Sequence, residues 1–352
     1  MTVWTLFQAG LINAPAKVPG LWHAHGMIFS YTVAIITGFL LTAVPRWSNA
    51  PAISTSKLKL LFSAWLGASI LSFFAELNLL SHIFQGIFWL VLLSYIFPTL
   101  VRGKTRNYGI LLILTIIFVW DFVFRYGYST NNFMICKASA HGALGTIMIL
   151  IVVIANRIIP LFTRNALGLK DLAIKPFIPY AAIIGAISYN FLVVIRPRTS
   201  LVMILIAVCA FAVLTPVFYW WRRAILKQPI LLIMYSAYLW VVIGITLSSV
   251  TVALSLPPLS SIHAMTIGGV GVMTYAMISR VALGHTGREI KAHSLTVLGY
   301  ILLNLSAIWR VFAPMLNHDY ITGIEGSGVL WIASFLLLAV AYTKILINPK
   351  LS

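Results

Sequence analysis

Five of the eight histidines are expected in one layer, at or near the same end of long apolar runs of the chain. His23 and His25 open the first run, His82 and His263 open two later runs, and His141 lies inside another. Ionisable side chains are costly within a membrane and mark functional sites there, and neutral imidazole is the commonest protein ligand for metals. The five histidines therefore predict a metal or haem site.

The spacing of the first two histidines constrains how they can bind. Residues two apart on an α-helix are separated by about 200° around its axis. His23 and His25 therefore cannot both bind one metal from a regular helix. Two alternatives remain open: the first turn is irregular, or the helix stands between two metal centres.

The other residue types narrow the kind of cofactor. No Cys-x-x-Cys-His segment occurs, so any haem would be a non-covalent haem b held by axial side chains. Imidazoles without paired thiolates also suit copper. We therefore expect haem b and copper as cofactors. The expected metal ligands are His25, His263 and His23, and His82 and His141 are expected to take part in cofactor binding.

Two of the six acidic residues, Glu76 and Asp121, are expected in the same layer as these histidines. Asp121 and Arg125 are spaced i, i+4, which predicts an ion pair on a helix. A second interpretation for either acid is to accept the N–H of a metal-ligating histidine and so fix the tautomer of the ring.

The elements that must position these residues are membrane helices. Hydrophobic residues make up 61% of the 352 residues, charged residues 9%, and the mean hydropathy is +1.00. A spanning helix needs about 20 apolar residues. Such runs occur at 21–44, 58–77, 79–101, 107–124, 135–163, 174–195, 199–221, 230–254, 259–282, 293–313 and 326–347. The sequence predicts an all-α, polytopic bundle of about 11 transmembrane helices in a single domain, 21–347.

The basic residues predict how the chain is oriented. The net charge of +18 is explained by Lys and Arg concentrated in every second connection, the mark of the cytoplasmic side. This pattern points to a lipid bilayer, not nucleic acid, as the partner. It predicts a short external N-terminal segment, 1–20, an outer histidine layer and a cytoplasmic tail, 348–352. The connections concerned contain Arg46, Lys57 and Lys59; Arg102, Lys104 and Arg106; Arg157, Arg164, Lys170 and Lys175; Arg222, Arg223 and Lys227; Arg280, Arg288 and Lys291.

Three stretches, "WHAHGMIFSYTVAIITGFLLTAVPRW", "ANRIIPLFTRNAL" and "HAMTIGGVGVMTYAMISRVALGHTGR", together resemble the NnrS family. The resemblance implies a haem- and copper-containing protein of the bacterial cytoplasmic membrane that takes part in the response to nitric oxide, its expected ligand. The positions that match the family's stretches are His23, His25 and His263 on the outer side, and Arg157, Arg280, His285 and Arg288 on the inner side.

The chain departs from the family pattern in two places. Family members usually have about twelve spans, with one helix ahead of the Trp-His-Ala-His segment, and this chain is expected to lack that helix. Family members also typically carry Glu after His-Ala-His, where this chain has Gly26. The second difference removes a carboxylate from beside the expected site and argues against a proton relay there.

Two other classes of function stay open. A haem-copper-type reductase of nitric oxide or oxygen would be a redox enzyme, but such proteins have an adjacent His-His pair, which this sequence lacks. A secondary transporter is indicated by Pro and Gly interruptions such as "LSLPPLSSIHAM". The sequence assigns no catalytic residue and identifies no redox partner.

Overall fold

The computed structural model describes residues 1–72, 78–103, 107–195, 199–316 and 320–350. Helices and their connections make up these ranges, and no strand occurs within them. Every apolar run identified in the sequence contains a helix. The predicted all-α membrane bundle is therefore confirmed.

The chain forms two compact units. The N-terminal unit comprises residues 10–147, and the C-terminal unit comprises residues 1–9 and 148–352. One long helix, α7 (Phe133–Leu167), supplies its first part to the N-terminal unit and the rest to the C-terminal unit.

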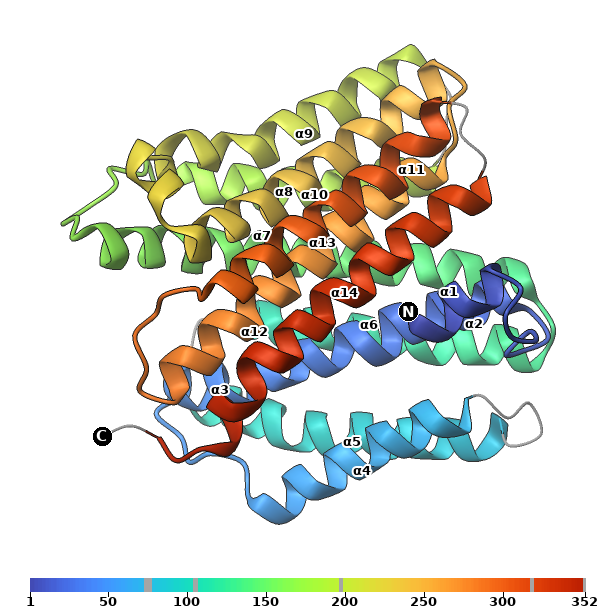
Figure 1. Cartoon of the computed structure of the whole chain (residues 1–352), viewed down its shortest axis with the longest axis horizontal. Coiled ribbons are helices and arrows are strands. Elements are labelled where there is room, and N and C mark those ends of the chain that lie inside the picture. The colour runs from blue at the N-terminus through green and yellow to red at the C-terminus, as the bar shows by residue number, and fades with distance from the viewer. Residues whose placement is uncertain (73–77, 104–106, 196–198, 317–319, 351–352) are drawn as a thin grey trace. The chain divides into compact units, whose positions relative to one another are not determined.

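Most of the residues predicted for the outer histidine layer belong to the N-terminal unit. Its elements before α7 are α2 (Pro19–His25), η1 (Gly26–Thr32), α3 (Val33–Ser48), α4 (Thr55–Leu71), α5 (Asn78–Arg102) and α6 (Tyr108–Ser129). Helices α4 and α5 pack side by side as a hairpin (Figure 1). Leu92, Ile96 and Ile117 are fully buried, so the apolar faces of α5 and α6 form part of the core of this unit.

The C-terminal unit is the larger of the two. Besides the end of α7 it contains α1 (Thr2–Gln8), α8 (Phe177–Ile195), α9 (Ser200–Trp220), η3 (Arg223–Lys227), α10 (Pro229–Ala253), α11 (Leu259–His263), η4 (Ala264–Gly271), α12 (Val272–His285), α13 (Ser294–Phe312), η5 (Ala313–Leu316) and α14 (Tyr320–Ile347). The continuous helix formed by α11, η4 and α12 is the most enclosed, with 83% of its apolar window buried, against 17% for 321–347. α13 and α14 pack along each other (Figure 1).

A π-helical segment follows a histidine directly in each unit. The segment η1 begins at Gly26 after His25, and η4 begins at Ala264 after His263. A π-helical turn contains more residues than an α-helical turn, which changes the residues that share a face, and such turns are frequent at functional sites. His23 and His25 themselves stand on the α-helix α2, and the irregular segment begins only after His25.

The helices of the described residues are those of a multi-pass membrane protein. Nine of them are long and apolar enough to cross a membrane, compared with the eleven predicted runs. The other two runs contain α4, with 17 residues, and α8, of which the apolar part 177–193 is shorter than a candidate span. Large apolar side chains such as Leu90, Phe122 and Val340 are 65–67% exposed, as expected where the surrounding solvent is hydrocarbon.

Candidate functional site

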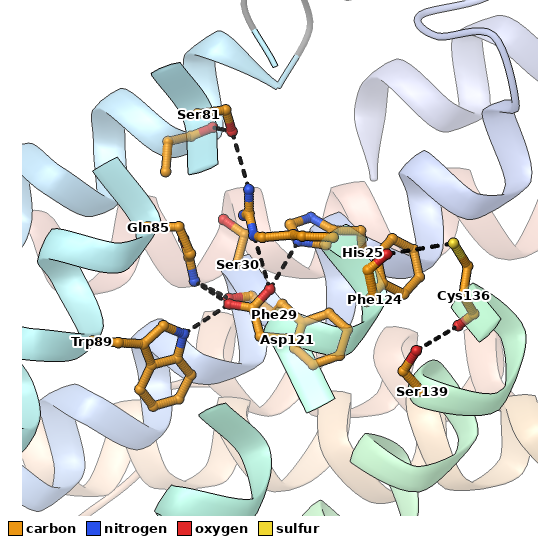
Figure 2. Close-up of polar contacts among 12 residues, drawn as sticks. His25, Phe29, Ser30, Ser81, Gln85, Trp89, Asp121, Phe124, Cys136 and Ser139 are labelled. Carbon is orange, nitrogen blue, oxygen red and sulfur yellow. Dashed lines mark hydrogen bonds and ion pairs between the residues drawn. The ribbon is translucent and has the colours of Figure 1, made fainter. Parts of the chain in front are cut away.

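His25 lies at the last position of α2, where the backbone passes into the π-helical segment. Its Nε2 atom lies 3.2 Å from Oδ1 of Asp121 on α6. The Asp121 side chain is 1% exposed and that of His25 is 13% exposed. Helix α2 and helix α6 thus place an imidazole and a carboxylate together in the interior of the N-terminal unit (Figure 2).

Asp121 receives hydrogen bonds at both carboxylate oxygens. Oδ1 accepts from Nε of Arg125 at 3.0 Å as well as from His25. Oδ2 accepts from Nε2 of Gln85 at 2.8 Å and from Nε1 of Trp89 at 2.7 Å. Figure 2 shows the side chains of His25, Gln85 and Trp89 directed at the carboxylate of Asp121. Four donors, one of them a guanidinium, stabilise the ionised acid, because each hydrogen bond favours the charged form.

This arrangement fixes the tautomer of His25. An ionised carboxylate can only accept, so Nε2 of His25 carries the proton and donates it to Asp121. The lone pair of the neutral ring then lies on Nδ1. A histidine that donates one ring N–H to a carboxylate and keeps the other nitrogen as a lone-pair donor is the usual state of a metal ligand.

The π-helical segment after His25 is held by side chains from two other helices. Nε1 of Trp65 on α4 donates to the carbonyl oxygen of Ser30 at 3.1 Å, and Nε2 of Gln85 on α5 reaches that of Phe29 at 3.5 Å. The hydroxyls of Ser30 and Ser69 lie 2.6 Å apart. Gln85 therefore links the backbone of the π-helical segment to the carboxylate that holds His25.

Aromatic rings enclose the imidazole on its apolar side. The ring centroid of His25 lies 5.4 Å from that of Phe29 and 5.1 Å from that of Phe124. The two phenylalanines are both buried. They cover that side of the imidazole with apolar surface, and such low-polarity surroundings strengthen the electrostatic component of its contact with Asp121.

A small cavity of about 40 Å³ adjoins this network. Its lining consists of Trp22, His25, Ser72, Ser81, His82, Phe124, Arg125 and Tyr128. A cavity needs about 10–15 Å³ to hold one water, so this one has room for a few waters, a metal ion or a diatomic molecule. A haem macrocycle does not fit in it.

The residues predicted for the outer layer differ in whether they line this cavity. His25 and His82 line the same cavity, whereas His23, which is half-buried, does not line it. His141 also belongs to the N-terminal unit and lies outside the cavity lining, and His263 belongs to the C-terminal unit. Glu76 lies outside the described residues. Within the described ranges, no three His, Cys, Asp or Glu side chains are grouped so that they could hold one metal ion.

The rings of His141 and His263 form their hydrogen bonds through Nδ1, whereas the ring of His25 forms its bond through Nε2. Nδ1 of His141 lies 2.7 Å from the carbonyl oxygen of Lys137, and Nδ1 of His263 lies 2.7 Å from that of Leu259. A carbonyl oxygen can only accept, so Nδ1 is protonated in both rings and the lone pair of the neutral ring is on Nε2. In each case the acceptor is four residues earlier on the same helix.

The predicted inner residues lie on α7, on α12 and in the connection after α12, all in the C-terminal unit. Arg157 is exposed on α7, and His285 is the last residue of α12. Arg288 follows in the next connection and donates from a terminal nitrogen to the carbonyl oxygen of Thr286 at 3.3 Å. Arg280, by contrast, is buried, with 7% of the residue exposed.

Sequence reasoning did not identify Gln85 and Trp89 as partners of Asp121. A signal was present, because Gln85 is a polar residue within an apolar run and Trp89 follows it at i+4, on the same face of a helix. Ser81, four residues before Gln85, lies on that face too, and its hydroxyl is 3.5 Å from a terminal nitrogen of Arg125. One face of α5 therefore carries a polar stripe that meets α6.

Comparison with known proteins identifies the family to which this chain belongs. A family model described as NnrS protein matches residues 1–350, nearly the whole chain. None of the curated proteins compared with the sequence matches it. The resemblance found in the three sequence stretches is thus confirmed over the full length, and the chain belongs to the NnrS family.

Proposed function

We propose that this chain is an NnrS-type protein of the bacterial cytoplasmic membrane that binds copper and haem b and takes part in the response to nitric oxide. The N-terminus would lie outside and the C-terminus in the cytoplasm. The observation that carries the proposal is His25, whose Nε2–H is held by the buried Asp121 while its ring lines a small cavity with His82.

Copper is the metal that these residues would suit. Imidazole nitrogen is a good ligand for copper, and two imidazoles border the cavity. The guanidinium of Arg125 borders it too, but its Nε lies 3.0 Å from Asp121. The carboxylate compensates that positive charge, which would otherwise oppose a cation. His25 and His82 would hold the metal, and the bound metal would supply a site that nitric oxide can ligate.

The haem requires other residues, because the cavity beside His25 is too small for it. His141 in the N-terminal unit and His263 in the C-terminal unit are two separate candidates, since the lone pair of each neutral ring lies on Nε2 and the ring is oriented by a hydrogen bond to its own helix. A ring oriented in this way loses little freedom when it binds iron. When bound, haem would supply an iron that binds nitric oxide.

Metal analysis and absorption spectra of the purified protein test this proposal. His25→Ala and His82→Ala should each lower the copper content at least tenfold and leave the haem spectrum in place. His141→Ala and His263→Ala should reduce the haem absorption. His293→Asn is the matched control, because His293 caps α13 through its side chain and Asn preserves a cap. Full copper and haem in all four alanine variants would show that these histidines are not ligands.

A further inference from the structure

A guanidinium lies buried in the C-terminal unit without an anionic partner among the described residues. Arg280 on α12 is 7% exposed. Its Cζ atom lies 3.8 Å from the ring centroid of Phe162 on α7, so the side chain is in contact with the face of that ring. It makes no ion pair or hydrogen bond with a residue that the structure describes.

The environment of Arg280 contains polar groups that are neutral. The hydroxyls of Ser279 and Tyr300 lie 2.7 Å apart, and Ser279 donates to the carbonyl oxygen of Ala276 at 3.0 Å. Tyr300 therefore donates to Ser279. These hydrogen bonds satisfy the hydroxyls, and none of the groups carries a negative charge.

Arginine stays charged in proteins, and an uncompensated buried charge destabilises the fold. A cation–π contact offsets only part of that cost. The other unit shows how this chain compensates such a charge, because the Arg125 side chain, 11% exposed, is paired with Asp121 at 3.0 Å. Arg280 has the same need, and no carboxylate among the described residues pairs with it.

We propose that Arg280 binds an oxyanion, a carboxylate or phosphate group of a bound ligand, with the Phe162 ring supporting one face of the guanidinium. A planar guanidinium donates two parallel hydrogen bonds to such a group. The anion has two possible sources. One is a propionate of haem, which rests on the proposed function, and the other is the phosphate of a membrane lipid.

The test compares Arg280→Met with the wild type in an uncharged maltoside detergent. Haem absorption, phospholipid retained through purification and the melting temperature with and without added phosphatidylglycerol are measured. Arg223→Met is the control, because Arg223 is an exposed arginine of the same unit. We expect Arg280→Met to lower the melting temperature and to lose the anion at least tenfold. Loss of haem absorption identifies a propionate, and loss of retained phospholipid and of its stabilising effect identifies a lipid phosphate.

A variant that keeps haem and lipid and melts at or above the wild-type temperature would overturn the inference, since removing an uncompensated buried charge is neutral or stabilising. If Arg280→Met does not fold, Arg280→Lys decides. Lysine keeps the charge but not the paired hydrogen bonds, so weaker anion retention is expected and unchanged retention would contradict the proposal. Wild-type protein without haem would refute the proposed function, and the lipid measurements would still test Arg280.

Discussion

His25 and Asp121 are 96 positions apart in the sequence, and their side chains are joined by a 3.2 Å contact between Nε2 and Oδ1. The same oxygen accepts from Nε of Arg125 at 3.0 Å. The carboxylate thus compensates the guanidinium and orients the imidazole at once. Because the partners come from α2 and α6, this contact ties the entry of the first membrane helix to the core of the N-terminal unit.

Replacing Asp121 by Asn should disturb both roles with little change of shape. The amide has one accepting oxygen, so the donors from His25, Arg125, Gln85 and Trp89 can no longer all be satisfied, and Arg125 is left buried without an anion. We expect the free energy of unfolding to fall by about 3 kcal/mol or more. Copper affinity should fall about 10–100-fold. Thermal unfolding and metal titration of the purified variant measure the two effects.

Asp171→Asn serves as the control for that variant. Asp171 is exposed, and among the described residues its side chain accepts a hydrogen bond only from the neighbouring backbone N–H of Leu172. It should leave stability and copper binding unchanged. Wild-type copper affinity in Asp121→Asn would mean that the carboxylate does not position a metal-binding imidazole.

The charge compensation between Asp121 and Arg125 predicts a coupling between their substitutions. Arg125→Gln alone leaves the carboxylate without its cation, and Asp121→Asn alone leaves the cation without its anion. The double variant removes both charges, so it should be more stable than the sum of the single effects predicts, by about 1–3 kcal/mol. A double-mutant cycle of unfolding free energies gives this number. Additive losses would show that the two charges act independently.

The fold was largely predictable because membrane spans are long apolar runs with a simple length requirement. The i, i+4 spacing of Asp121 and Arg125 also predicted their contact, which depends on one helix alone. Which histidine meets Asp121 was not predictable, because pairing between α2 and α6 leaves no periodic signal in either segment. The sequence predicted a layer of five histidines, with His25, His263 and His23 as the metal ligands, whereas the structure brings His25 and His82 to one cavity.

The π-helical segments were the other feature beyond sequence reasoning. An α-helical period cannot predict which residues share a face at η1. The π-helical turn is wider, so the residues after it are rotated relative to those of α2. The bonds that hold it come from Trp65 and Gln85 on other helices. Local propensity does not encode such support, since it depends on how three helices pack.

The second π-helical segment predicts a packing constraint in the C-terminal unit. A Cβ atom on Gly268 of η4 would overlap the Trp240 side chain of α10, whose Nε1 donates to Oδ1 of Asn304 at 3.0 Å. Gly268→Ala should displace that indole and destabilise the protein by about 1–3 kcal/mol. Gly38→Ala in α3 is the control, because nothing lies within 4 Å of its added Cβ. It should be neutral or stabilising by up to about 1 kcal/mol, and equal effects of the two variants would contradict the packing argument.

The distribution of basic residues predicts the orientation on which the terms outer and inner depend. Arg280, Arg288 and Lys291 surround the end of α12, and Arg222 and Arg223 lie at the connection after α9. Lys and Arg accumulate in cytoplasmic connections. A reporter enzyme fused after Lys350 should therefore be active in the cytoplasm. One inserted near Asn78 should be active only outside, where the ends of α2 and α6 that carry His25 and Arg125 are then expected. The reverse labelling would place that cavity at the cytoplasmic face, so that nitric oxide arriving from outside would meet it only after crossing the bilayer.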